Sequence, residues 1–349
     1  MGSTSVDNGD EKKKKRTQLI LLLATNLVSL AFLYWALRDS NLSQTGAELK
    51  RMGWWWVGLA VVTDILVYFW HGWRWSLLLS PLECVPFWTC VRAIYVGLFA
   101  NEVLPFRTGE LIRCFLLARW TTLPLSVTLS SALIERIFDG LWLIVCLIIT
   151  IQFVHLPKYL VDGAWVLATV VGLCGVLLAI AMFYKQQTKE VFANTKNPIL
   201  KTLNILIEDL HIIGHSRFLY FAAFASIPYL LMQAVPIWAL AKGYPGFDLT
   251  IAQSFALMVI LRLGSVVPQA PGNLGLFQSL TRVGLVLFGV PHGIASRFSL
   301  VVWGVITLPL LIVGFIALAV TGLKMGDLHR EAHGCIQNNE SIVRSRKLE

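Results

Sequence analysis

Long apolar runs alternate with short polar connections along most of the chain. A run of about 20 residues is long enough to cross the hydrocarbon core of a bilayer as a helix. Runs of this kind cover residues 19–37, 54–79, 124–153, 161–184, 217–241 and 296–323. The pattern therefore predicts an all-α, polytopic helical membrane protein with about six full spans.

Two further segments are apolar but interrupted. Residues 86–120 are broken at Pro105-Phe106-Arg107-Thr108-Gly109-Glu110, and residues 250–290 at Pro268-Gln269-Ala270-Pro271-Gly272-Asn273. Each half is too short or too charged to cross a bilayer comfortably. We favour two re-entrant hairpins, although additional spans, including 86–104 and 251–267, would preserve the same sidedness.

The basic residues predict the orientation of the chain. Clusters of Lys and Arg lie before the first run, in the segment 185–216 and after residue 323. Basic segments stay in the cytoplasm, so we expect both termini there and a multi-pass protein of the cell (inner) membrane. A signal peptide would have a shorter apolar region and a small-residue cleavage site, whereas the first run ends Tyr34-Trp35-Ala36-Leu37.

These observations give a domain plan. Residues 1–16 form a basic cytoplasmic tail, 17–323 the transmembrane domain, and 324–349 a second cytoplasmic tail. Apolar positions in the 185–216 linker fit an amphipathic helix at the membrane surface. The loop 38–53 is then external, and the two hairpins enter from opposite sides. Opposed broken segments are typical of inverted-repeat transporters, which bind substrate where the breaks meet.

Composition excludes several classes of protein. Of the 349 residues, 56% are hydrophobic and 14% charged, against about a quarter charged in soluble domains. The net charge of +9 lies in the tails and loops of a hydrophobic chain, so it indicates topology and no nucleic-acid partner. The six cysteines are scattered, and we expect no metal and no cofactor. An ATPase or hydrolase motif is also missing.

Three charged residues stand together in the run 124–153, which makes them functional candidates. At 100° per residue, Glu135 and Asp139 lie about 40° apart, and Arg136 and Asp139 about 60° apart, so all three share one face. Glu135 lies about 16 Å from Pro124, near the midplane. Two acids and one base require a second cation.

The segment after the first break supplies that cation. Arg107, Glu110 and Arg113 recur every three residues and form a face with one excess positive charge. One hypothesis is that Arg107 or Arg113 binds a lipid phosphate through its planar fork. The alternative is a self-neutralising ion network that only locks the helices together.

Other polar residues in apolar runs are weaker candidates. Asp64 and His71 lie on one face of the run 54–79 and are candidates for proton coupling, or else form a satisfied polar pair. Near the second break, Arg262, Arg282 and Asn273 are candidates for contact with a headgroup, although Arg282 could instead snorkel to an interface.

The motifs resemble a known family. The run Asn101 to Arg113, the Glu135-Arg136-x-x-Asp139 group and the Pro271-Gly272-Asn273-Leu274-Gly275 turn resemble, in order and spacing, the lysylphosphatidylglycerol synthase transmembrane-region family. This is the flippase-like domain of the aminoacyl-phosphatidylglycerol synthase/flippases and of the AglD and YbhN groups. The resemblance covers about 17–323 and implies a re-entrant membrane domain that moves a phospholipid or polyprenyl-linked lipid between leaflets.

The resemblance also assigns residues and sets limits. The polar lining of the lipid path would comprise Arg107, Glu110, Arg113, Glu135, Arg136 and Asp139. Where the family's turn commonly ends in an acid, this chain has Phe277-Gln278, so an acidic role there is not implied. The soluble acyltransferase domain of the synthases and the glycosyltransferase domain of the AglD type are not seen, so we expect no aminoacylation by this chain.

Three functions remain open from the sequence. The leading hypothesis is a lipid translocase, a transporter rather than an enzyme, whose partner is an anionic phospholipid or a polyprenyl-phosphate-linked lipid. The second is a membrane-embedded transferase with a polyprenyl-phosphate donor and Glu110, Glu135 or Asp139 as base. The third is an accessory subunit of a separate lipid-modifying enzyme.

Overall fold

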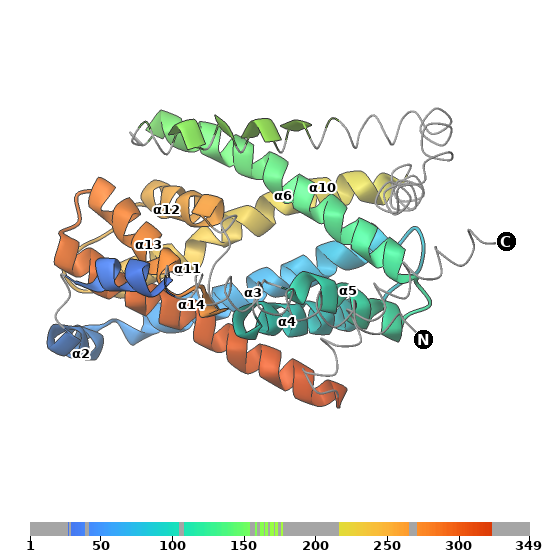
Figure 1. Ribbon diagram of the computed structural model, residues 1–349, viewed down its shortest axis with the longest axis horizontal. Helices are drawn as coiled ribbons and strands as arrows, with labels where there is room; N and C mark the ends of the chain where they lie inside the picture. Colours follow the sequence, from blue (N-terminus) through green and yellow to red (C-terminus); the bar gives the residue numbers. More distant parts are fainter. Residues whose placement is uncertain are drawn as a thin grey trace, which may run out of the picture.

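The computed structural model describes residues 27, 29–38, 42–104, 108–153, 216–264 and 271–322, with isolated positions between 158 and 176. Every regular element in these ranges is a helix, which confirms the all-α prediction (Figure 1). The longer ones, after a first helix over 29–37, are α2 (Leu42–Arg51), α3 (Trp54–Leu79), α4 (Phe87–Val103), α5 (Gly109–Trp120), α6 (Leu125–Phe153), α10 (Arg217–Met232), α11 (Ala234–Gly243), α12 (Ile251–Gly264), α13 (Leu276–Leu287) and α14 (His292–Thr321).

Candidate membrane spans are fewer in these ranges than the sequence predicts. The joined helices Arg217–Gly243, of 27 residues, and α14, of 30 residues, are long and apolar enough to cross a membrane. A third candidate is α2 with α3, which are bent by 88° at the residues between them. Six spans and an inverted repeat remain predictions. Both tails, nearly all of the 185–216 linker and most of 161–184 lie outside the described residues.

Helix α3 holds the two main hydrophobic cores together. It packs against α4, α6, α10, α11 and α14. Its Ala60 and Val67 belong to a core with α10 to α14, whereas Trp75 and Leu79 belong to a core with α4, α5 and α6. In Figure 1, α3 runs through the middle of the bundle. Polar side chains on α3 are therefore placed where several helices meet.

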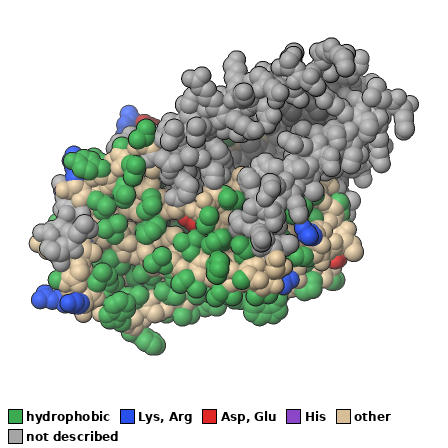
Figure 2. All heavy atoms as spheres, turned by 60° about the horizontal axis from the view of Figure 1, so that its bottom comes forward, with side chains coloured by type: hydrophobic (Ala, Val, Ile, Leu, Met, Phe, Trp, Pro, Cys, Tyr) green, Lys and Arg blue, Asp and Glu red, His purple; other side chains and the backbone are tan. Residues whose placement is uncertain are grey.

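The outer surface of the bundle is apolar. Large hydrophobic side chains are exposed on α3, α6, α10 and α14. In Figure 2 hydrophobic side chains spread over the described part of the face, while Lys and Arg lie mainly near its edges. Trp54 and Trp55, at the start of α3, are exposed, as expected of an interfacial aromatic anchor. Apolar exteriors of this kind suit contact with lipid.

The region expected to be a polar loop at 38–53 contains helix α2. Glu48 on α2 accepts hydrogen bonds from Arg297 of α14, over 2.8 Å from Nε and 2.6 Å from Nη2, and another from the Tyr244 hydroxyl. Partial burial acts to raise the pKa of Glu48, but these donors outweigh it and hold that pKa below its ordinary value. Arg297 fixes α2 against the bundle and was not among the residues expected from the sequence.

Both interrupted segments form helix pairs. Helices α4 and α5 flank the first break, and α12 and α13 flank the second. The four helices span about 18 to 26 Å at 1.5 Å per residue, less than the roughly 30 Å hydrocarbon core. The breaks also touch, since Asn273 Nδ2 donates to Glu102 Oε1 over 2.7 Å. Re-entry into the membrane itself remains a prediction.

Glycine allows α4 and α5 to cross closely. A Cβ on Gly97 would lie 2.7 Å from the Gly109 carbonyl oxygen and 2.8 Å from Arg113 Cβ. A Cβ on Gly109 would meet the Gly97 carbonyl oxygen and the Asn101 side chain. The Asn101 side chain in turn accepts a 2.8 Å hydrogen bond from Gly109 N, which satisfies a free donor at the start of α5. This crossing positions Glu110 and Arg113.

We predict that Gly109→Ala destabilises the protein by about 1–3 kcal/mol, because the added carbon has no space between the two helices. Thermal unfolding of the purified protein in detergent measures the effect. Gly58→Ala is the matched control, since a Cβ on Gly58 meets nothing within 4 Å. Equal unfolding temperatures for the two variants would contradict the close crossing.

Candidate functional site

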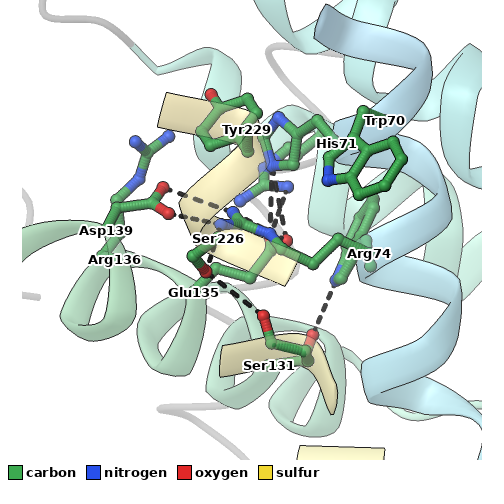
Figure 3. Close-up of polar contacts among 12 residues, drawn as sticks. Trp70, His71, Arg74, Ser131, Glu135, Arg136, Asp139, Ser226 and Tyr229 are labelled. Carbon is green, nitrogen blue, oxygen red and sulfur yellow. Dashed lines mark hydrogen bonds and ion pairs between the residues drawn. The ribbon is translucent and has the colours of Figure 1, made fainter. Parts of the chain in front are cut away.

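Charged side chains from α3, α5 and α6 converge inside the bundle (Figure 3). We call this group the ion network. Five of its seven members are candidates from the sequence, whereas Arg74 was not identified and His71 was assigned to a different role. Its members are His71, Arg74, Glu110, Arg113, Glu135, Arg136 and Asp139.

Glu135 is the centre of the network and is 2% exposed. Its Oε2 accepts a hydrogen bond from Arg113 Nη1 over 3.0 Å. Its Oε1 accepts one from Arg74 Nη2 over 3.3 Å. His71 Nε2 lies 3.4 Å from both oxygens. A buried carboxylate is costly unless it is paired and hydrogen-bonded, and here two guanidinium groups from other helices satisfy it.

Arg74 is the cation that sequence reasoning missed. It is fully buried and pairs with Asp139, where Nη2 donates to Oδ2 over 3.3 Å and Nη1 contacts Oδ1. Its Nη1 also donates to Ser226 Oγ over 2.7 Å. The expected second cation was Arg107 or Arg113, and Arg107 lies outside the described residues. The available signal was an arginine three positions after His71 within an apolar run.

Glu110 connects the two arginines at the other end of the network. Its Oε2 accepts a hydrogen bond from Arg113 Nε over 2.9 Å, and its Oε1 accepts one from Arg136. The side chains of Glu110 and Arg136 are 35% and 45% exposed, whereas that of Arg113 is 3% exposed. The network therefore runs from a buried centre to an accessible end, and its arginines and carboxylates balance in number.

A second polar group adjoins the network through an aromatic ring. The Arg74 guanidinium lies 4.6 Å from the ring centroid of Tyr229 on α10. Arg262 of α12 lies 5.9 Å from the same centroid, and its Nη2 is 3.4 Å from the Tyr229 hydroxyl. Arg262 Nε also donates to Gln233 Oε1 over 2.5 Å. We call Tyr229, Gln233 and Arg262 the Tyr229 cluster.

Asp64 and His71 do not form the polar pair considered from the sequence. His71 contacts Glu135, and its ring lies 5.1 Å from that of Tyr229. Asp64, seven positions earlier, is 7% exposed and feels the charge of Arg262. It makes no hydrogen bond or ion pair with another described residue. Their shared helical face was predicted correctly, but the two side chains have different surroundings.

The candidates beside the second break divide between two roles. Arg282 is 3% exposed and its Nη1 lies 3.5 Å from the Ala36 carbonyl, while its guanidinium stacks 4.7 Å from the Trp35 ring. It therefore anchors the end of the first helix and does not snorkel to an interface. Asn273, by contrast, contacts Glu102 at the first break.

We predict that Arg74→Ala lowers the free energy of unfolding by about 3–5 kcal/mol, because it leaves Asp139 inside the bundle without its cation. The double variant Arg74→Met/Asp139→Leu should recover part of this loss. Unfolding in detergent followed by tryptophan fluorescence measures both. The exposed Arg51→Ala is the control, and an Arg74→Ala protein as stable as this control would contradict the pairing.

Comparison with known proteins places this arrangement in a family. Residues 21–314 match the family described as lysylphosphatidylglycerol synthase TM region. No curated protein and no solved structure shows significant similarity to the chain. The matched residues include the whole ion network, the Tyr229 cluster and both breaks. The chain thus belongs to the lysylphosphatidylglycerol synthase TM region family.

Proposed function

We propose that the protein translocates a lipid with an anionic headgroup between the two leaflets of a membrane. The family relates the chain to membrane-bound lipid synthesis or translocation. The observation that carries the finer proposal is the ion network itself, which places buried charges from three helices inside a bundle with an apolar exterior. The lipid is an anionic phospholipid or a polyprenyl-phosphate-linked lipid.

A polar line through the bundle supports this proposal. A headgroup entering hydrocarbon loses its hydration at a cost of several kcal/mol unless hydrogen-bond donors replace the water. The ion network and the Tyr229 cluster provide such donors from half-exposed Arg136 to Arg262. Guanidinium forks suit phosphate oxygens especially well. The acyl or prenyl chains would meanwhile remain against the apolar outer surface.

The geometry favours translocation over group transfer. A transferase would need a carboxylate oxygen directed at its substrate as a base. Both oxygens of Glu135 face arginines or His71, and both oxygens of Asp139 face Arg74. Glu110 likewise engages two arginines. A translocase, in contrast, requires matched charges that shield a headgroup and needs no catalytic base.

Proton coupling, within this proposal, is assigned to Asp64 rather than to His71. Asp64 is buried near Arg262, and its surroundings contain no hydrogen-bond or ion-pair partner among the described residues. His71 instead belongs to the ion network through Glu135. A carboxylate without such a partner is better placed to exchange a proton than a group held by its neighbours.

We predict that the purified protein in liposomes exchanges a fluorescent phosphatidylglycerol between leaflets while the mass of the lipid stays unchanged. Dithionite quenching measures the exchange, and mass spectrometry measures the lipid. Arg262→Gln should slow the exchange about tenfold, which corresponds to roughly 1.4 kcal/mol of lost contact with the headgroup. Lys242→Gln, on the more exposed Lys242–Asp248 pair, is the control.

Two results would contradict this function. One is a donor-dependent change in lipid mass that is lost in Glu135→Gln, since this indicates a transferase. The other is exchange that appears only after a lipid-modifying enzyme is added, since this indicates an accessory subunit.

We also predict a cytoplasmic location for both termini, because the basic segments sort to one side. A cysteine at Gln44 on α2 should react with an impermeant maleimide added to intact cells, whereas one at Lys196 should not. The background carries Cys84→Ser, since Cys84 is exposed. The reverse labelling pattern would overturn this topology.

A further inference from the structure

The carboxylate of Glu110 bridges two guanidinium groups at the accessible end of the ion network. Its two oxygens divide between Arg113 and Arg136, which come from different helices, α5 and α6. A phosphate group binds a pair of arginines in the same manner, with separate oxygens directed at separate forks. Glu110 thus occupies the place that a bound phosphate would take.

The surroundings of Glu110 differ from those of the other carboxylates in the network. The Glu135 side chain is 2% exposed and that of Asp139 is 14% exposed, whereas that of Glu110 is 35% exposed. Only Glu110 among the three can turn outward without burying an unpaired charge. It also lies in the first turn of α5, where the helix dipole favours a negative group whether that group belongs to the protein or to a ligand.

The two arginines would respond differently to the departure of Glu110. Arg113 would keep its 3.0 Å hydrogen bond to Glu135. Arg136 would lose its partner, since among the described residues Glu110 is the carboxylate with which it pairs. One positive charge would remain uncompensated at a half-exposed position. An anion with a single negative charge would restore the balance.

We propose that Glu110 is an internal counter-ion, which the phosphodiester of the transported lipid replaces one for one. This inference rests on the proposed translocation function and names its substrate class. A phosphodiester carries the same single negative charge as the carboxylate, so the exchange leaves the net charge inside the membrane unchanged. A phosphomonoester carries about −1.5 to −2 near pH 7 and would bring an excess of negative charge. The site therefore selects phosphodiesters over phosphomonoesters.

Binding of short-chain lipids to the full chain in detergent tests this proposal. We expect dihexanoylphosphatidylglycerol to bind wild type more tightly than dihexanoylphosphatidic acid, as measured by isothermal titration calorimetry. Glu110→Gln should bind the phosphodiester about tenfold more tightly, because the ligand no longer competes with a charged hydrogen-bond partner. The difference in affinity between the two lipids should also become smaller in Glu110→Gln, since the variant site carries one more positive charge.

Matched variants separate this mechanism from a general effect. Arg136→Gln should bind the phosphodiester at least about tenfold more weakly, because a charged donor is lost. Glu83→Gln is the control, since the half-buried Glu83 side chain lies outside the ion network and, among the described residues, accepts hydrogen bonds from Thr122, over 3.1 Å from its backbone nitrogen and 2.6 Å from its hydroxyl. If Glu110→Gln does not fold, Glu110→Asp replaces it. The shorter carboxylate cannot bridge both arginines, so this variant should also bind the phosphodiester more tightly than wild type.

A second arm of the experiment compares the two lipid classes that could supply the phosphodiester. A short prenyl phosphosugar presents the same group on a different chain, and the tighter of the two ligands identifies the lipid class. Equal or weaker binding by Glu110→Gln would overturn the counter-ion role even if wild type exchanges lipid. Tighter binding by Glu110→Gln without any lipid exchange would support the phosphodiester site at Glu110 and contradict the translocation function.

Discussion

Glu135 carries a negative charge into the interior of the bundle, where three helices must pack so that it is neutralised. A carboxylate that is 2% exposed in the middle of the apolar helix α6 must be compensated, or it costs several kcal/mol. Arg74 from α3 and Arg113 from α5 provide that compensation. Because the two arginines come from different helices, the pairing fixes α3, α5 and α6 relative to one another.

The packing of α3, α4 and α5 places those two arginines beside Glu135. Helix α3 passes between the two hydrophobic cores, so Arg74 arrives where α6 and α10 meet. Gly97 and Gly109 let α5 approach α4 closely enough to stack Arg113 on the face of the Trp75 ring, whose centroid lies 4.6 Å from the guanidinium. Substitutions at these glycines should therefore affect the ion network as well as helix packing.

The sequence predicts which residues share a helix face but not which helices face each other. The period of 3.6 residues correctly placed Glu135, Arg136 and Asp139 together. It could not show that Asp139 pairs with Arg74 or that Arg136 pairs with Glu110, since these contacts depend on the packing of α3, α5 and α6. The helix pairs around both breaks were predictable, because Pro and Gly interrupt apolar runs there.

Neutral residues left still weaker signals. Tyr229 connects the ion network to Arg262, yet an aromatic residue in an apolar run is indistinguishable from a core residue. Gln233 and Ser226 were missed because one uncharged polar residue in an apolar run does not indicate its partner, here Arg262 for Gln233 and Arg74 for Ser226.

Arg297 was missed because its partner Glu48 lay in a segment taken as a loop, where α2 was not expected.

The proposed function requires that a lipid headgroup occupies the polar line inside the bundle. Electron cryomicroscopy of the protein in nanodiscs that contain phosphatidylglycerol tests it most directly. We expect density for a phosphate within hydrogen-bond distance of Arg136 and Arg113, with Glu110 turned away. Headgroup density confined to the outer surface, with Glu110 still bridging both arginines, would contradict it.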